Sequence, residues 1–272
     1  MMVDIISMIL LLFIFMIGLS VGSFLTAFTY RVPTGKNISK GRSYCPKCKN
    51  TIKWYDNIPL ISFLLLKGKC RNCSEKISKR YPMIESVTAF SFVIIALYSC
   101  GCIYQSAGNG ICQYFNIFGT HTAPYLFVVS AIFIAVFVTD FEHQIILDEL
   151  VFLLFILTFF MIILYSPGTV FVRLLSGFIA SLFLLLLHLV TRGRGMGLGD
   201  VKLALAGGMI LGWPLTLVWV GLSFVIGGAI GVLLLLNKRI KFGKQIAFGP
   251  FLVLAFFITL IFGENIFMMF VP

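Results

Sequence analysis

Charge is scarce in this chain. Only 11% of its 272 residues are charged, whereas a soluble domain usually carries about 25%. Acids are scarcer than bases, with 10 Asp and Glu against 21 Lys and Arg, and 60% of all residues are hydrophobic. So little polar surface excludes an ordinary water-soluble domain. The net charge of +11 is therefore assigned to loops beside anionic lipid rather than to nucleic-acid binding.

The sequence also lacks low-complexity tracts, clear internal repeats, and any soluble segment beyond residues 31–81. Apolar runs near bilayer length fill most of the remainder, which predicts an all-α polytopic membrane protein. The first run has no basic stretch before it, so we expect a retained helix rather than a cleaved signal peptide. About eight transmembrane helices are expected, at 5–28, 82–100, 124–140, 149–166, 169–190, 200–212, 216–236 and 247–270.

The basic residues are unevenly distributed. Twenty of the 21 lie in the segments 31–81, 191–202 and 237–246, and Arg173 is the exception. With eight spans, all three segments face one compartment, which the positive-inside rule identifies as the cytoplasm. The loop 101–123 contains no Lys or Arg and is expected on the outside.

Four of the seven cysteines form two CxxC pairs in the basic segment. The pairs are Cys45/Cys48 and Cys70/Cys73, with 21 residues between them. Four thiolates at this spacing can hold one structural zinc ion in a tetrahedron, and the reducing cytoplasm disfavours disulfides. A redox or incidental pair is the alternative. Cys102 and Cys112 flank the outer loop, where a disulfide between them and free thiols are both open.

Two of the few acids stand at the ends of predicted spans. Asp140 closes the third span in AVFVTDFEHQIILDEL, and Asp200 opens the sixth span after GMGLG. On the predicted topology both face the cytoplasm. Taken singly, Asp140 could mark the membrane boundary and Asp200 could be a helix N-cap. Together they predict an aspartyl pair, in which one carboxylate takes a proton from water and the other donates one to a carbonyl.

The loop before Asp200 is rich in glycine. Lacking a Cβ, glycines allow close approach of an extended substrate backbone and positive φ angles. The residues concerned are Gly193, Gly195, Gly197 and Gly199. Glu85, near the start of the second span, requires a partner or water, since an unpaired acid there is costly. We expect His143 to be a solvated loop residue, with tuning of the aspartyl pair as the alternative, and His188 to be an ordinary residue of the fifth span.

Five stretches resemble, in order, motifs of the type IV prepilin peptidases, also called prepilin leader peptidase/N-methyltransferases, a GxGD-type membrane aspartyl protease family. They are GLSVGSFLTAFTYRVP (18–33), the four-cysteine loop, SKRYPMIE (78–85), TDFEHQIILDEL (139–150) and GMGLGDVKLALAGG (195–208). The resemblance implies that Asp140 and Asp200 are catalytic. It also implies a zinc loop at the four cysteines, and we expect Gly195, Gly197 and Gly199 to line the substrate.

The resemblance implies two activities at the bacterial cytoplasmic (inner) membrane. One is cleavage of the short basic leader from type IV prepilin or pseudopilin precursors, which serve pili or protein secretion. The other is methylation of the new N-terminal amine with S-adenosylmethionine. The sequence contains no glycine-rich nucleotide-binding fingerprint, so it does not locate a methyl-donor site.

Three parts are predicted in the chain: a first transmembrane helix at 1–30, a cytoplasmic four-cysteine zinc loop at 31–81, and a membrane-embedded protease core at 82–272. Two other function classes are left open. One is a regulated intramembrane aspartyl protease that acts on other substrates. The other is a zinc-regulated membrane transporter, in which the two acids would lie along a conducting path.

Overall fold

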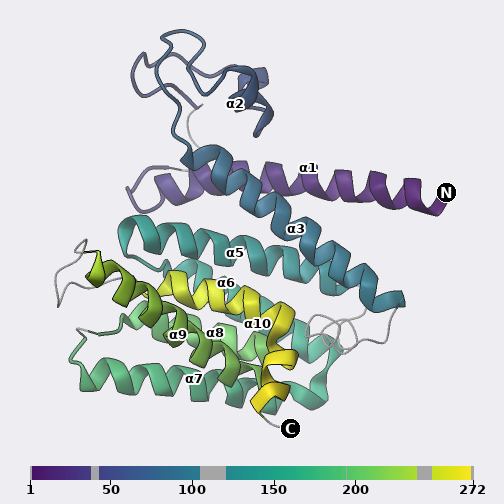
Figure 1. Cartoon of the computed structure of the whole chain (residues 1–272), viewed down its shortest axis with the longest axis vertical. Coiled ribbons are helices and arrows are strands. Elements are labelled where there is room, and N and C mark those ends of the chain that lie inside the picture. Colours follow the sequence, from purple (N-terminus) through teal and green to yellow (C-terminus); the bar gives the residue numbers. More distant parts are fainter. Residues whose placement is uncertain (1, 38–42, 105–120, 194, 238–246, 271–272) are drawn as a thin grey trace. The chain divides into compact units, whose positions relative to one another are not determined.

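The chain is built from helices in its computed structural model (Figure 1). The structure describes all residues except 1, 38–42, 105–120, 194, 238–246 and 271–272, so the question of a Cys102–Cys112 disulfide lies outside the described residues. No strand occurs in the described part, where only the isolated bridges Tyr44–Thr51 and Lys69–Lys76 are found. The prediction of an all-α membrane protein is confirmed.

Seven of the described helices are long and apolar enough to cross a bilayer. They are α1 (Met2–Arg31), α3 (Arg80–Tyr104), α5 (Thr122–His143), α6 (Asp148–Tyr165), α7 (Val170–Val190), α9 (Leu215–Leu236) and α10 (Gly249–Phe270). Each falls on one of the predicted spans. The remaining predicted span forms α8 (Leu198–Leu211), whose 14 residues extend only about 21 Å, less than the ~30 Å hydrocarbon core.

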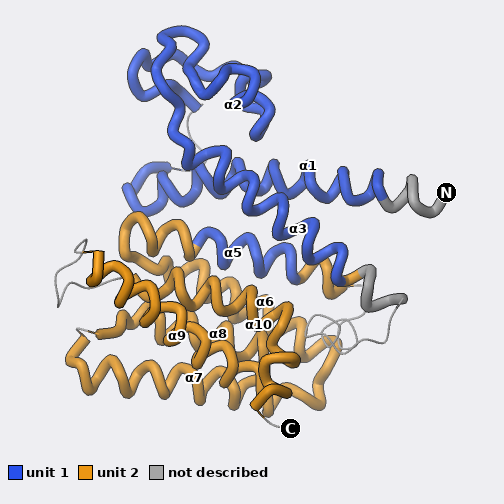
Figure 2. The backbone as a smooth tube through the Cα atoms, viewed as in Figure 1, with its two compact units in different colours: residues 1–98, 126–135 blue, residues 99–125, 136–272 orange. Residues whose placement is uncertain are grey.

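The chain divides into two compact units (Figure 2). Unit 1 comprises residues 1–98 and 126–135, and unit 2 comprises residues 99–125 and 136–272. The helix α5 contributes residues to both units. The three-part division at residues 30 and 81 stays a prediction.

In unit 1, α1 and α3 pack closely through small residues. A Cβ on Gly18 would lie 2.6 Å from the Ala89 Cα, and one on Gly22 would lie 2.7 Å from the Glu85 Cα. Only glycine permits this approach, a common device between membrane helices. Arg80 joins the end of α1 to the start of α3, because its guanidinium donates to the Thr26 carbonyl at 2.9 Å and to the Thr29 hydroxyl at 2.7 Å.

The segment between α1 and α3 contains the 3₁₀ helix η1 (Trp54–Asn57), the short helix α2 (Ile61–Leu65) and the two cysteine pairs. It is attached to α3, because the Leu60 N–H donates to Glu85 Oε2 at 2.7 Å. Glu85 therefore has the partner that its buried position requires. The expectation that Glu85 needs a partner is thus met by the backbone N–H of Leu60.

In unit 2, α8 is enclosed by protein. It contacts α6, α7, α9 and α10. The helix α7 approaches it so closely that a Cβ on Gly177 would lie 2.4 Å from the Leu205 carbonyl oxygen, and the Trp219 ring of α9 fills the space beside Gly207. Buried Arg173 of α7 donates to the Ile210 carbonyl at 2.6 Å, which satisfies an acceptor in the last turn of α8. Enclosed in this way, α8 does not need the length of a lipid-exposed span.

Candidate active site and metal centre

The two predicted aspartates lie together in unit 2. Asp140 is in the last turn of α5 and is 6% exposed, and Asp200 is in the first turn of α8 and is 5% exposed. Gly249, which lies against Asp140, and Gly199, which precedes Asp200, both approach the side chain of Ile146. Two acids 60 positions apart in the sequence are thus buried in the same region of the unit.

Each carboxylate lies beside a glycine and has one buried oxygen that is open. The Gly197 N–H donates to Asp200 Oδ2 at 3.1 Å, and the Gly249 backbone lies against the Asp140 carboxylate. Asp140 Oδ2 and Asp200 Oδ1 are buried and have no hydrogen-bond partner among the described residues. An unsatisfied buried polar atom costs about 1–3 kcal/mol, so this arrangement is typical of a site completed by a water, a substrate group or a shared proton.

Asp200 is not the N-cap of α8. That position is Gly197, and Asp200 is the third residue of the helix. Its carboxylate reaches back to the N-cap N–H, which is one half of a capping box. The other half is absent because glycine has no side chain. Helix capping therefore accounts for only one of the two Asp200 oxygens.

The glycine loop does not use positive φ as expected. Among its four glycines only Gly193 has a positive φ, of 75°. Close contacts within the chain restrict the other three positions instead, most tightly at Gly195 and Gly199. A Cβ on Gly199 would lie 2.9 Å from the Ile146 Cβ, and one on Gly197 would lie 3.2 Å from Asp200 Oδ2. The expectation of positive φ is thus wrong for Gly195, Gly197 and Gly199.

The end of α7 positions this loop through residues that sequence reasoning missed. His188 Nδ1 donates to the Met196 carbonyl at 2.6 Å, and the Thr191 hydroxyl accepts the Gly195 N–H at 3.2 Å. The only signal in the sequence is an imidazole inside a 21-residue apolar helix. His143, expected to be solvated, is instead the last residue of α5, and its Nε2 is buried without a partner among the described residues.

Gly249, the first residue of α10, was also missed. A Cβ at this position would lie 2.5 Å from Asp140 Oδ2, so the carboxylate fits against the helix only because no side chain is present. The Ile146 side chain lies between Gly199 and Gly249, because a Cβ on either glycine would contact it.

Asp148, another acid of the same stretch as Asp140, lies in different surroundings. It is the first residue of α6, and Lys202 Nζ contacts both of its carboxylate oxygens at 2.8 Å. Both side chains are more than half exposed. Asp148 therefore links the starts of α6 and α8 at the surface, apart from the buried pair.

The four cysteines gather in unit 1. The four Sγ atoms all lie within 4.8 Å of one another, and those of Cys45 and Cys73 are 3.7 Å apart. A tetrahedral zinc ion with Zn–S bonds of about 2.3 Å places its sulfurs about 3.8 Å apart, so the cluster fits this ion. The backbone N–H groups of Cys48 and Lys47 lower the pKa of the Cys45 thiol, whereas burial and the three neighbouring thiols raise the pKa of Cys73. Four thiols this close do not all ionise readily unless a cation lies among them.

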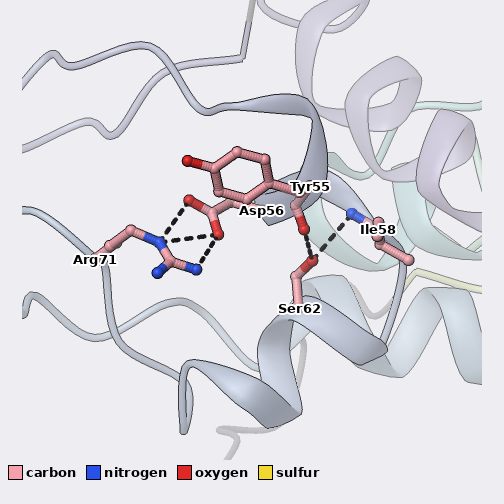
Figure 3. Close-up of polar contacts among 5 residues, drawn as sticks. All are labelled: Tyr55, Asp56, Ile58, Ser62 and Arg71. Carbon is pink, nitrogen blue, oxygen red and sulfur yellow. Dashed lines mark hydrogen bonds and ion pairs between the residues drawn. The ribbon is translucent and has the colours of Figure 1, made fainter.

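Two ion pairs brace the cysteine pairs. Arg71, within the second pair, donates from Nε and Nη2 to the Asp56 carboxylate at 2.6–3.1 Å (Figure 3). This contact holds the pKa of Asp56 below its usual range. Lys47 of the first pair contacts Glu75, just beyond the second. Both cysteine turns are therefore fixed to their surroundings by side-chain contacts as well as by any shared metal.

Two family models match the chain. Residues 16–99 match the bacterial peptidase A24 N-terminal domain, and residues 127–232 match the type IV leader peptidase family. The prepilin leader peptidase/N-methyltransferase of Aeromonas salmonicida (strain A449) is 30% identical over 283 residues, which cover 93% of this chain and 91% of the relative. The chain belongs to the type IV leader peptidase family. The resemblance inferred from the five motifs is confirmed.

Other members of the type IV leader peptidase family are similarly related. The prepilin leader peptidase/N-methyltransferase of Bacillus subtilis (strain 168) is 31% identical over 261 residues, covering 95% of this chain and 96% of the relative. That of Vibrio cholerae serotype O1 is 31% identical over 259 residues, covering 89% and 93%. No solved structure matches the chain. The first matched domain contains the four-cysteine cluster, and the leader peptidase match contains both buried aspartates.

Proposed function

We propose that this protein is an aspartic endopeptidase that removes the basic leader from type IV prepilin or pseudopilin precursors. The cleavage takes place at the cytoplasmic face of the bacterial inner membrane. The observation that carries the proposal is the buried pair of carboxylates, each with an open oxygen, at one end of the helices of unit 2. The names of the relatives, which include both peptidase and N-methyltransferase, support a second activity that methylates the new N-terminus with S-adenosylmethionine.

Asp140 and Asp200 act as a general acid–base pair in this proposal. Because like charges at short distance do not both ionise readily, one carboxyl keeps its proton. The ionised partner takes a proton from a water molecule, whose oxygen attacks the scissile carbonyl carbon while the protonated acid donates to the carbonyl oxygen. The tetrahedral intermediate then collapses, the amide nitrogen receives a proton, and the C–N bond breaks. No covalent intermediate with the protein forms.

The position of Asp200 at the start of a helix suits a bond at the membrane–water interface. The apolar segment of a precursor stays in the bilayer and its basic leader stays in water, so the scissile bond lies at the boundary. Water reaches that depth without crossing hydrocarbon. Gly195, Gly197 and Gly199 add no side chains of their own to the loop before Asp200, against which an extended substrate strand lies.

Zinc in this proposal has a structural role. Cys45, Cys48, Cys70 and Cys73 hold the ion, and its binding free energy stabilises a segment with little core of its own. Replacing Cys48 with Ser is expected to lower the metal content from one zinc per chain to near zero and to expose the backbone of residues 43–77 to hydrogen exchange. Metal analysis and exchange mass spectrometry of the purified protein measure both effects. A parent protein that contains no zinc after purification without chelators would contradict the assignment.

The cytoplasmic orientation rests on the distribution of Lys and Arg. Reporter fusions near residues 60, 195 and 241 are expected to report the cytoplasm, and a fusion near residue 110 the outside. If the fusion at 110 reports the cytoplasm, the basic segments before and after it would no longer be predicted on the same side of the membrane. That result would overturn this orientation.

Co-expression with a pilin precursor tests the proposed function. In a bacterial host without its own leader peptidase, intact-mass analysis of the recovered pilin should show loss of the leader and a gain equal to one methyl group. A shortened pilin without the methyl mass would support the peptidase and reject the second activity. An unchanged precursor in the presence of well-expressed protein would reject the proposal.

A further inference from the structure

The short helix α2 in unit 1 has an exposed apolar face. Ile61, Leu64 and Leu65 have the i, i+3, i+4 spacing that places side chains on one side of a helix. They are 41%, 65% and 76% exposed, and Trp54 of η1, which contacts α2, is 80% exposed. We name these four residues the apolar tip. Single exposed apolar side chains are common in proteins, but a group of four in one short segment is typical of an interaction surface.

The apolar tip is held rigidly by the rest of its segment. The Ser62 hydroxyl donates to the Tyr55 carbonyl at 2.9 Å and accepts the Ile58 N–H at 3.0 Å, which fixes η1 against α2 (Figure 3). The ion pair between Asp56 and Arg71 then fixes η1 to the second cysteine pair. The tip is therefore an ordered part of the cysteine segment rather than a loose loop.

The apolar tip is tied to α3 near the start of its membrane-spanning stretch. The Leu60 N–H, one residue before α2, donates to Glu85 Oε2. Glu85 is five residues beyond Arg80, where the membrane-spanning stretch of α3 begins, and this separation corresponds to about 7.5 Å along the helix. Helices that lie in the membrane surface bury their apolar faces by about 5–10 Å. The contact with Glu85 thus sets α2 beside α3 near that depth.

The charges around the apolar tip indicate which surface it meets. Lys53, Lys67 and Lys69 are exposed beside its residues in the sequence. The two acids of the cysteine segment are neutralised, because Asp56 pairs with Arg71 and Glu75 pairs with Lys47. An apolar face with basic neighbours, one of them next to an exposed tryptophan, is complementary to the headgroups and upper acyl chains of anionic lipid.

We propose that the apolar tip inserts into the surface of an anionic bilayer beside α3, with Lys53, Lys67 and Lys69 against lipid phosphates. The cysteine segment would then lie on the membrane at this point and not extend freely into water. This lipid-binding surface is separate from the buried aspartates, and it does not depend on the proposed protease activity.

Photo-crosslinking in lipid nanodiscs tests the proposal with the full-length chain. A photoreactive amino acid replaces Leu65 in one variant, and the exposed Asn72 of the second cysteine pair in a matched control. In discs of phosphatidylethanolamine and phosphatidylglycerol, we expect several-fold more lipid adduct at position 65 than at position 72, measured by mass spectrometry. Combining the Leu65 probe with Lys67→Gln and Lys69→Gln should lower the yield to the level found in phosphatidylcholine discs.

The zinc content of each variant reports whether the segment remains folded. With zinc retained, equal lipid adduct at positions 65 and 72 would overturn the proposal. A cross-link from position 65 to a second copy of the chain would overturn it as well, because the tip would then be a protein interface. If the probe at position 65 unfolds the segment, tryptophan fluorescence of the chain without the probe decides. Quenching by brominated lipid that is smaller in Trp54→Phe than in the parent chain supports insertion, and identical quenching of both chains contradicts it.

Discussion

Replacing either Asp140 or Asp200 with Asn is expected to abolish leader cleavage. An amide neither accepts a proton from water nor donates one as a carboxylic acid does, so either change removes half of the acid–base pair. General acid–base groups contribute about 10²- to 10⁴-fold each, and losses at or beyond the upper limit are expected for groups that act together. The measurement is the initial rate of precursor cleavage by purified variants in proteoliposomes.

The longer acid is expected to fail in the same assay. Asp140→Glu or Asp200→Glu moves the carboxylate by more than about 1 Å, enough to lose a geometry that both acids must share. All of these variants should still insert into the membrane and bind zinc, because neither aspartate is in the cysteine segment. Normal zinc content thus separates lost catalysis from lost folding.

Asp148→Asn is the matched control. Asp148 is exposed and paired with Lys202, and such surface pairs contribute about 0–1 kcal/mol. The variant should therefore keep a cleavage rate close to that of the parent protein. If Asp148→Asn were inactive while Asp140→Asn cleaved normally, Asp200 would have been paired with the wrong acid.

Gly249→Ala is expected to produce the second large loss of cleavage, although glycine has no chemistry of its own. The added Cβ would lie 2.5 Å from Asp140 Oδ2, a distance that real Cβ contacts essentially never show. The Asp140 carboxylate or the start of α10 must then move. Displacement of a reacting group by about 1 Å can cost about 10²-fold, so we expect a fall in kcat of that order with zinc binding unchanged.

Gly228→Ala controls for the general effect of adding a methyl group to a glycine in a membrane helix. Among the described residues, no heavy atom outside its own helix neighbourhood lies within 4 Å of the Cβ position at Gly228 in α9. Its kcat should equal that of the parent. Equal kcat values for Gly249→Ala and Gly228→Ala would show that the Asp140 carboxylate does not need its present position against α10.

The sequence predicted those parts of the site that depend on local pattern. Hydrophobic length located the helices, and the spacing of the cysteines predicted a cluster that the folded segment does bring together. The two acids could be paired because the topology placed them at the same membrane face. Each of these inferences rests on the length of apolar runs, the spacing of cysteines or the positions of charged residues. All three can be read from the sequence alone.

The contacts that fix the site could not be predicted in this way. Gly249 is 109 positions from Asp140, and only the packing of α10 brings them together. His188 looked like one polar residue in an apolar helix until the folded loop placed the Met196 carbonyl beside it. The glycines before Asp200 were expected to allow positive φ. At Gly199 the close approach of Ile146, which is distant in the sequence, leaves no room for a side chain instead. Packing distances of this kind depend on how helices meet, which periodicity does not encode.

The most direct test of the central claim compares the single variants Asp140→Asn and Asp200→Asn with the double variant. Residual cleavage rates are measured in proteoliposomes by intact mass of the precursor, with zinc content matched between samples. If the two acids work as one unit, removing the second costs nothing further, and all three residual rates should be equal. Losses that multiply in the double variant, or a single variant that cleaves at the parent rate, would contradict a shared aspartyl pair.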